Sequence, residues 1–117
     1  MTHEFGSKLE EDYGWIGFDL DGTLSIYDEW KGLEHIGEPI ESMMKLAKLY
    51  QLEGYEIKIM TARASDPLQI PSVKAWALLH GLGDIEVTCC KDFRMRMLYD
   101  DRCIQVEFNT GRIITDG

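Results

Sequence analysis

The sequence predicts an α/β fold in which helices cover a mainly parallel sheet. Short apolar stretches alternate along the chain with longer stretches whose apolar residues recur at helical spacing. Strands that alternate with helices pair in parallel through right-handed crossovers, and this produces a layered domain. Acidic or hydroxyl residues follow three of the expected strands, and ligands of such sheets bind at the carboxyl ends of the strands. We therefore expect a layered α/β domain with a ligand site at that edge.

Four strands and two helices are expected. The strands lie at residues 13–19, 56–61, 85–90 and 97–100, which are short and apolar. The helices lie at residues 39–53 and 71–82. Pro39 suits the first turn of the first helix, and Gly54 suits its end. The turn signal Asn-Thr-Gly within residues 104–115 favours a short C-terminal hairpin, and a helical turn after Asp101 is the rival interpretation.

Composition limits the class of protein. The chain has 117 residues, so we expect a flexible tail at residues 1–12 and a single domain at residues 13–117. It contains no apolar stretch long enough to cross a membrane and no apolar signal core, and its three cysteines have no zinc spacing. These features predict a cytoplasmic protein with reduced thiols. The net charge of −9 argues against a broad basic surface for duplex nucleic acid.

Two carboxylates follow the first expected strand. Asp19 and Asp21 lie two residues apart on a turn, and Gly22 lets the backbone of that turn approach an anion. Two neighbouring acids repel each other unless a cation neutralises them. Magnesium suits this pair because it takes hard oxygen ligands and commonly binds carboxylates together with substrate phosphate. One carboxylate can then attack as a nucleophile while the other transfers protons.

Further polar residues follow the later strands. Asp100 and Asp101 form a second acidic pair after the fourth strand, and sharing a metal with the first pair explains both. Thr61 follows the second strand and can donate its hydroxyl to a phosphoryl oxygen, although a threonine there also suits a helix cap. Lys91 follows the third strand and can hold a phosphate or neutralise the nucleophile.

These residues resemble the ordered motifs of the haloacid dehalogenase (HAD) superfamily of phosphatases. The first motif stands at residues 18–24 (Phe-Asp-Leu-Asp-Gly-Thr-Leu), the second at residues 59–63 (Ile-Met-Thr-Ala-Arg) and the fourth at residues 98–102 (Leu-Tyr-Asp-Asp-Arg). The third motif is one basic residue, assigned here to Lys91, and the fallbacks are Lys74, Arg94 and Arg96. The resemblance implies a three-layer, Rossmann-like HAD core with a mainly parallel sheet.

The resemblance also implies a role for each motif residue. Asp19 would attack phosphorus and form an aspartyl-phosphate, and Asp21 would protonate the leaving group and then activate water. Thr61 and Lys91 would hold the phosphoryl group, and the neighbouring motif residues Gly22, Thr23, Ala62 and Arg63 would contact the substrate. Asp19, Asp21 through its backbone carbonyl, Asp100 and Asp101 would surround Mg²⁺. The implied activity is a magnesium-dependent phosphomonoester hydrolase.

Neither segment that could hold a cap domain is longer than a loop, so a capless member is expected. The loop around Tyr27 and Trp30 is the local candidate for substrate contacts, although packing is the commoner role of such a tryptophan. The motifs are similar to those of phage-encoded HAD hydrolases and of the phosphatase domain of phage polynucleotide kinase. This similarity suggests a nucleotide, another phosphorylated small molecule or a nucleic-acid end as substrate. An uncovered edge strand favours a homodimer.

Two other classes of function stay open. A receiver-like phosphoacceptor domain also uses clustered aspartates, a threonine, a lysine and magnesium, but its adjacent acids close the first strand. A non-catalytic module that binds phosphate and magnesium would carry the same acids without turnover.

Overall fold

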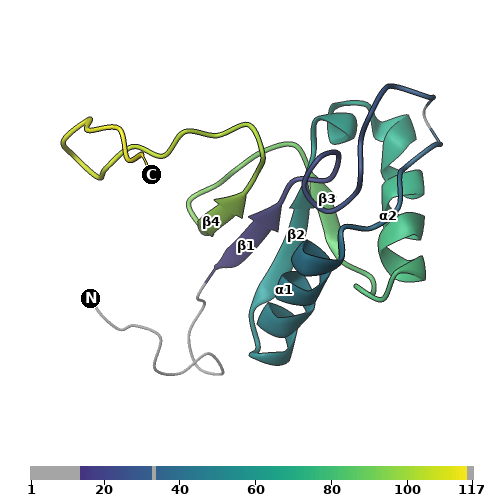
Figure 1. The fold of residues 1–117 in the computed structure, drawn as a ribbon. Helices are drawn as coiled ribbons and strands as arrows, with labels where there is room; N and C mark the ends of the chain where they lie inside the picture. The colour runs from purple at the N-terminus through teal and green to yellow at the C-terminus, as the bar shows by residue number, and fades with distance from the viewer. Residues whose placement is uncertain (1–13, 33, 116–117) are drawn as a thin grey trace.

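The computed structural model describes residues 14–32 and 34–115 and has the element order β-α-β-α-β-β (Figure 1). The strands are β1 (Trp15–Phe18), β2 (Glu56–Met60), β3 (Glu86–Thr88) and β4 (Met95–Tyr99). The helices are α1 (Glu41–Leu52) and α2 (Ile70–Leu79), and the 3₁₀ turns η1 (Ala62–Ser65) and η2 (Pro67–Gln69) precede α2. All six expected elements are therefore confirmed within a few residues. The expected tail at residues 1–12 lies outside the described residues.

The four strands form one sheet in the order β3-β2-β1-β4, and every neighbouring pair is parallel. Phe18, at the end of β1, aligns with Ile59 of β2 and with Tyr99 of β4. The carboxyl ends of these strands therefore meet at one edge of the sheet. The predicted parallel α/β architecture is confirmed.

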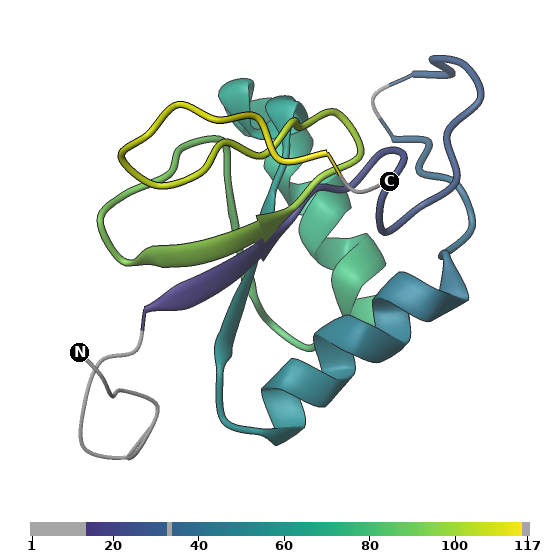
Figure 2. The same ribbon diagram turned by 60° about the vertical axis from the view of Figure 1, so that its left-hand side comes forward.

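Both helices cover the same face of the sheet (Figures 1 and 2). Ile16 and Ile57 point to this face and belong to one buried cluster with Met44 and Ala47 of α1 and Val73 of α2. Each of these side chains is at most 3% exposed. The described residues thus form two layers, and the expected third layer is absent from them. The connection from β3 to β4, residues 89–94, is too short to hold a helix.

The opposite face is covered by a polar arrangement around Trp15. Trp15 is fully buried, and its indole N–H donates to Asp92 at 2.9 Å. The Nζ atom of Lys58 lies 4.6 Å from the centre of the Trp15 ring and 3.3 Å from Glu86. The β3–β4 connection, which carries Asp92, therefore contacts the face that the helices leave uncovered.

Residues 26–32 and 34–38 belong to a loop, called the 26–38 loop, that is anchored at its base. Ile26 N–H donates to the carbonyl of Glu38 at 2.8 Å, and the indole of Trp76 donates to the carbonyl of Gly37 at 3.0 Å. A Cβ atom on Gly37 would lie 2.0 Å from the carbonyl oxygen of Ile26, so only glycine fits there. Pro39 pairs with Ser25 in a β-bridge, and α1 begins only at Glu41. The prediction that Pro39 lies in the helix was wrong, because this bridge holds it outside.

The C-terminal segment turns back on itself as expected. Asn109 and Gly111 have positive φ angles of 64° and 82°, and Val106 and Ile113 form an antiparallel bridge around them. Beyond this bridge, the two sides of the turn do not form named strands. The alternative interpretation, a helical turn after Asp101, is not among the described helices. The segment extends beyond the β4 edge of the sheet, away from the helices (Figure 1).

None of the helices in residues 14–32 and 34–115 combines the length and the apolar character needed to cross a membrane.

Candidate active site

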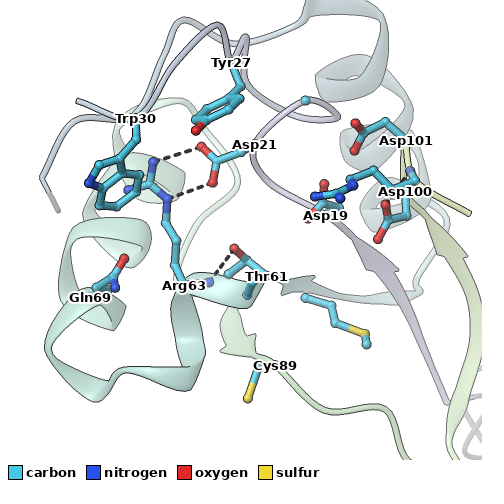
Figure 3. A pocket seen from close by; sticks show the side chains of 14 residues that line it. Asp19, Asp21, Tyr27, Trp30, Thr61, Arg63, Gln69, Cys89, Asp100 and Asp101 are labelled. Carbon is cyan, nitrogen blue, oxygen red and sulfur yellow. Dashed lines mark hydrogen bonds and ion pairs between the residues drawn. The ribbon is translucent and has the colours of Figure 1, made fainter. Parts of the chain in front are cut away.

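A cavity of about 680 Å³ opens at the carboxyl ends of the central strands (Figure 3). Its walls come from the segments after β1, β2, β3 and β4 and from the 26–38 loop. Its lining residues are Asp19, Asp21, Gly22, Tyr27, Trp30, Met60, Thr61, Ala62, Arg63, Gln69, Cys89, Asp100, Asp101 and Arg102. The cavity therefore brings together residues from three of the four expected motifs.

Three carboxylates gather on one side of this cavity. Asp19, Asp100 and Asp101 each offer an oxygen atom, and these atoms lie within 4.8 Å of one another. Partial burial of Asp19, followed by repulsion from Asp100, raises the pKa of the Asp19 carboxyl to about 7. Three acids in this arrangement repel one another unless a cation or a proton intervenes. The donor set, which is all carboxylate oxygen, fits a hard divalent cation such as Mg²⁺.

The backbone and Thr23 hold the three carboxylates in place. Asp19 N–H donates to the carbonyl of Tyr99 at 2.9 Å, which links the ends of β1 and β4. The Thr23 hydroxyl lies 3.4 Å from Asp19 Oδ2 and 3.3 Å from Asp101 Oδ1, and it accepts from Asp101 N–H at 3.1 Å. Thr23 is buried and is not among the residues that line the cavity. Its hydroxyl contacts both acids and can therefore orient them.

Gly22 makes a close approach to the acidic cluster. Its φ angle is +93°, and a Cβ atom there would lie 2.8 Å from Asp101 Oδ2. Glycine is therefore needed at this position for both its backbone conformation and its lack of a side chain.

Asp21 lies in the same cavity but makes a separate interaction. Arg63 donates through Nε to Asp21 Oδ2 at 2.8 Å and through Nη2 to Asp21 Oδ1 at 2.9 Å. Nη2 of Arg63 also donates to the carbonyl of His35 at 2.9 Å, and the guanidinium lies 4.9 Å from the centre of the Trp30 ring. Both oxygens of Asp21 are thus engaged, and its carboxylate does not belong to the cluster of three acids.

Thr61 follows β2 directly and is 3% exposed. Its Oγ1 atom accepts from Arg63 N–H at 3.1 Å and caps the turn η1. The capping role that the sequence left open is therefore observed. The hydroxyl hydrogen of Thr61 can still donate into the cavity, which both Thr61 and Ala62 line.

The basic residue of the third motif is not brought into the cavity. Lys91 is exposed on the β3–β4 connection, two residues after Cys89, which does line the cavity. The fallbacks lie elsewhere: Lys74 pairs with Asp84 at 3.2 Å, and Arg94 pairs with Glu56 at the opposite end of the sheet at 3.0 Å. Arg96 lies within β4 and does not line the cavity. Within residues 14–32 and 34–115, the cations that do line it are Arg63 and Arg102.

Several lining residues were not singled out from the sequence. Arg102, Cys89 and Met60 had a usable signal, because each lies next to a residue expected at a strand end. Gln69 had none, since the turn that carries it is an irregular connection between β2 and α2. Tyr27 and Trp30, expected as substrate contacts, do line the cavity.

Comparison with known proteins finds no match among family models, curated proteins or solved structures.

Proposed function

We propose that this chain is a magnesium-dependent phosphomonoester hydrolase of the haloacid dehalogenase type. The observation that carries the proposal is the cluster of Asp19, Asp100 and Asp101 at the carboxyl ends of β1 and β4, in one cavity with Thr61. An acidic cluster alone also occurs on ordinary surfaces. Here it is supported by the order of the sequence motifs and by the parallel sheet that brings three of them together.

The residues that would hold Mg²⁺ are Asp19, Asp100, Asp101 and the backbone carbonyl of Asp21. Bound magnesium would neutralise these carboxylates and the charge that develops on the phosphoryl oxygens. The raised pKa of Asp19 supports this assignment, because repulsion from Asp100 and Asp101 contributes to it. A cation would relieve that repulsion and leave Asp19 ionised as a nucleophile.

The chain's own residues suffice for a balanced two-step displacement. A carboxylate oxygen of Asp19 attacks phosphorus while the bond to the leaving oxygen breaks, and Asp21 gives that oxygen its proton. Asp21 then takes a proton from water, and the resulting attack on the aspartyl-phosphate releases inorganic phosphate and regenerates Asp19. Thr61 donates its hydroxyl to a phosphoryl oxygen. Lys91 holds the same group if its flexible side chain turns in from the β3–β4 connection.

This mechanism requires that the Asp21–Arg63 pair opens. A carboxylate with both oxygens bound to a guanidinium cannot transfer a proton to a leaving group. The arrangement thus corresponds to a resting state, and substrate binding has to draw Arg63 away from Asp21.

A phosphatase screen with Mg²⁺ tests the proposal. The panel contains nucleotides, sugar phosphates and 3′-phosphorylated oligonucleotides, and the variants are Asp19→Asn and the matched control Asp84→Asn, a remote exposed acid paired with Lys74. We expect Asp19→Asn to abolish turnover and Asp84→Asn to retain it. Equal turnover by the wild type and Asp19→Asn contradicts the nucleophile assignment. Lys91→Met and Arg102→Met identify the phosphate-holding cation, which we expect to be Lys91.

The Asp21–Arg63 pair favours a second candidate, a non-catalytic module that binds magnesium and phosphate. In such a module the pair would stay closed and the acid would never be released. Calorimetric binding of Mg²⁺ and inorganic phosphate without turnover of any substrate distinguishes this module from the enzyme.

A further inference from the structure

The cavity has a second region, the aromatic region, formed by Tyr27, Trp30 and Gln69. Figure 3 shows these side chains on one side of Asp21 and Arg63, and Asp19, Asp100 and Asp101 on the other. Tyr27 and Trp30 belong to the 26–38 loop and are 48% and 52% exposed. Half-exposed aromatic rings in a cavity wall offer flat surfaces on which a planar ligand can stack.

Gln69 adds an unpaired hydrogen-bonding group to the aromatic region. Its Oε1 atom is buried and has no hydrogen-bond partner among the described residues. A buried acceptor without a partner is unfavourable, so a ligand donor gains binding energy there once the Gln69 side chain turns this atom toward the cavity. The side-chain amide presents an acceptor and a donor next to each other, the combination with which glutamine binds the edge of a nucleobase.

The proposed chemistry places the leaving group in the aromatic region. The phosphoryl group lies at Asp19, and the proton from Asp21 goes to the leaving oxygen, so this oxygen has to lie on the Asp21 side of phosphorus. Asp21 stands between the three carboxylates and the aromatic region (Figure 3). The remainder of the leaving group then extends toward Trp30 and Gln69.

We propose that the leaving group is a nucleoside and that the substrate is a nucleoside monophosphate. The base stacks against Trp30 and Tyr27 and pairs with the amide of Gln69. The guanidinium of Arg63, 4.9 Å from the centre of the Trp30 ring, adds a second kind of planar group on which bases stack. A volume of about 680 Å³ suits a ligand of this size, and the net charge of −9 disfavours a long polynucleotide. This inference rests on the proposed phosphatase function.

Matched substrates test the nucleoside assignment. We compare kcat/KM for adenosine 3′- and 5′-monophosphates with kcat/KM for ribose 5-phosphate, which lacks the base. In the wild type the better nucleotide should exceed ribose 5-phosphate about tenfold or more, the usual effect of one stacked base. Trp30→Ala and Gln69→Ala should each lower this ratio, and Trp30→Phe should restore most of it. Phe93→Ala, which removes a fully exposed aromatic side chain outside the cavity, should leave it unchanged.

Each contrary outcome has a separate meaning. A ratio near one, or a ratio that Trp30→Ala and Gln69→Ala do not alter, overturns the nucleoside assignment while the phosphatase proposal stands. A higher kcat/KM for a 3′-phosphorylated hexanucleotide than for either mononucleotide identifies nucleic-acid ends as the substrate and overturns the mononucleotide.

If the wild type hydrolyses no substrate on the panel, the phosphatase proposal is contradicted. The nucleoside assignment is then tested by measuring the binding of a nucleotide. Adenosine 5′-monophosphate should quench the fluorescence of Trp30, the exposed tryptophan of the three, and ribose 5-phosphate should not. The quenching should disappear in Trp30→Phe. Absence of quenching in the wild type overturns the assignment.

Discussion

Asp19 makes the stability of the metal-free protein depend on pH. Its folded-state pKa, about 7, lies above the ordinary value of 3.8, so the folded protein binds more protons than the unfolded chain between these values. The free energy of unfolding contributed by Asp19 therefore falls as the pH rises from about 4 to about 7. Thermal melts in EDTA should show that Asp19→Asn removes this decline and raises the melting temperature at pH 8.

Magnesium provides the control for the Asp19 prediction. Because a bound cation neutralises the three carboxylates, Mg²⁺ should raise the melting temperature of the wild type most at pH 8 and least at pH 5. Asp84→Asn should behave as the wild type does. A wild type and an Asp19→Asn variant with parallel stability profiles between pH 4 and 7 would contradict the raised pKa.

Gly22 and Gly32 form a matched pair for testing the geometry of the acidic cluster. Both have positive φ angles, +93° and +111°, so alanine strains the backbone at either position by about 1–3 kcal/mol. Only at Gly22 does the added Cβ meet a carboxylate, 2.8 Å from Asp101 Oδ2, whereas nothing lies within 4 Å at Gly32. We expect Gly22→Ala to weaken Mg²⁺ binding about tenfold or more, measured by calorimetry, and Gly32→Ala to preserve it. Equal affinities in the two variants would show that Asp101 does not contribute to the site.

The sequence predicted correctly that Asp19, Asp100 and Asp101 lie together, but it did not predict that Asp21 pairs with Arg63. Asp19, Asp100 and Asp101 meet because each follows a parallel strand, and strand ends can be located from apolar patterns. The pairing of Asp21 with Arg63 depends on the path of two irregular segments. The spacing of apolar residues does not indicate the path of an irregular segment. The pairing of Asp21 with Arg63 could therefore not be predicted from the sequence.

Arg63 connects three parts of the structure, and we expect its replacement to loosen the 26–38 loop. It joins the turn η1 to Asp21 after β1 and to the carbonyl of His35 within the loop. Arg63→Gln should destabilise the fold by about 1.5–3 kcal/mol, the range for hydrogen bonds to charged groups. Hydrogen exchange of loop amides should accelerate in the same variant.

A matched surface variant separates this effect from simple loss of charge. Arg112 pairs with Glu107 at 3.1 Å, but its side chain is 63% exposed, so Arg112→Gln should change stability little. Arg63→Lys keeps the charge without the two-pronged geometry and should fall between Arg63→Gln and the wild type. If the loop amides of Arg63→Gln exchange their hydrogens as slowly as those of the wild type, Arg63 is not needed to hold the loop. The Ser25–Pro39 bridge and the hydrogen bonds at the base of the loop then suffice.

At the scale of elements, the apolar patterns located every named strand and helix. The expectation of three layers came from the resemblance to the HAD core, and the described residues form two. Here residues 89–94 make the connection from β3 to β4 without a helix, and Trp15 and Lys58 are buried on that face by polar partners instead. A tryptophan and a lysine on the same side of neighbouring strands do not have a recognisable apolar pattern, so the missing layer could not be read from the sequence.

For the whole molecule, the edge of the sheet and the C-terminal segment predict self-association. β4 is an edge strand, and the segment beyond it exposes a group of apolar side chains: Ile104, Val106, Phe108 and Ile113, each at least 55% exposed. Exposed edges and clustered apolar side chains favour pairing with a second copy. We expect sedimentation velocity to show a monomer–dimer equilibrium that shifts toward dimer with protein concentration.

The interface can be tested by removing apolar area from this segment alone. The double variant Val106→Ser/Phe108→Ser should shift the equilibrium toward monomer. Its control, Leu52→Ser/Leu68→Ser, removes two side chains that are 85% and 79% exposed on other parts of the surface and should leave the equilibrium unchanged. Because the segment lies apart from the helices and their buried cluster, the first variant should keep the wild-type melting temperature at low concentration. A wild type that sediments as a monomer at every concentration would exclude this dimer.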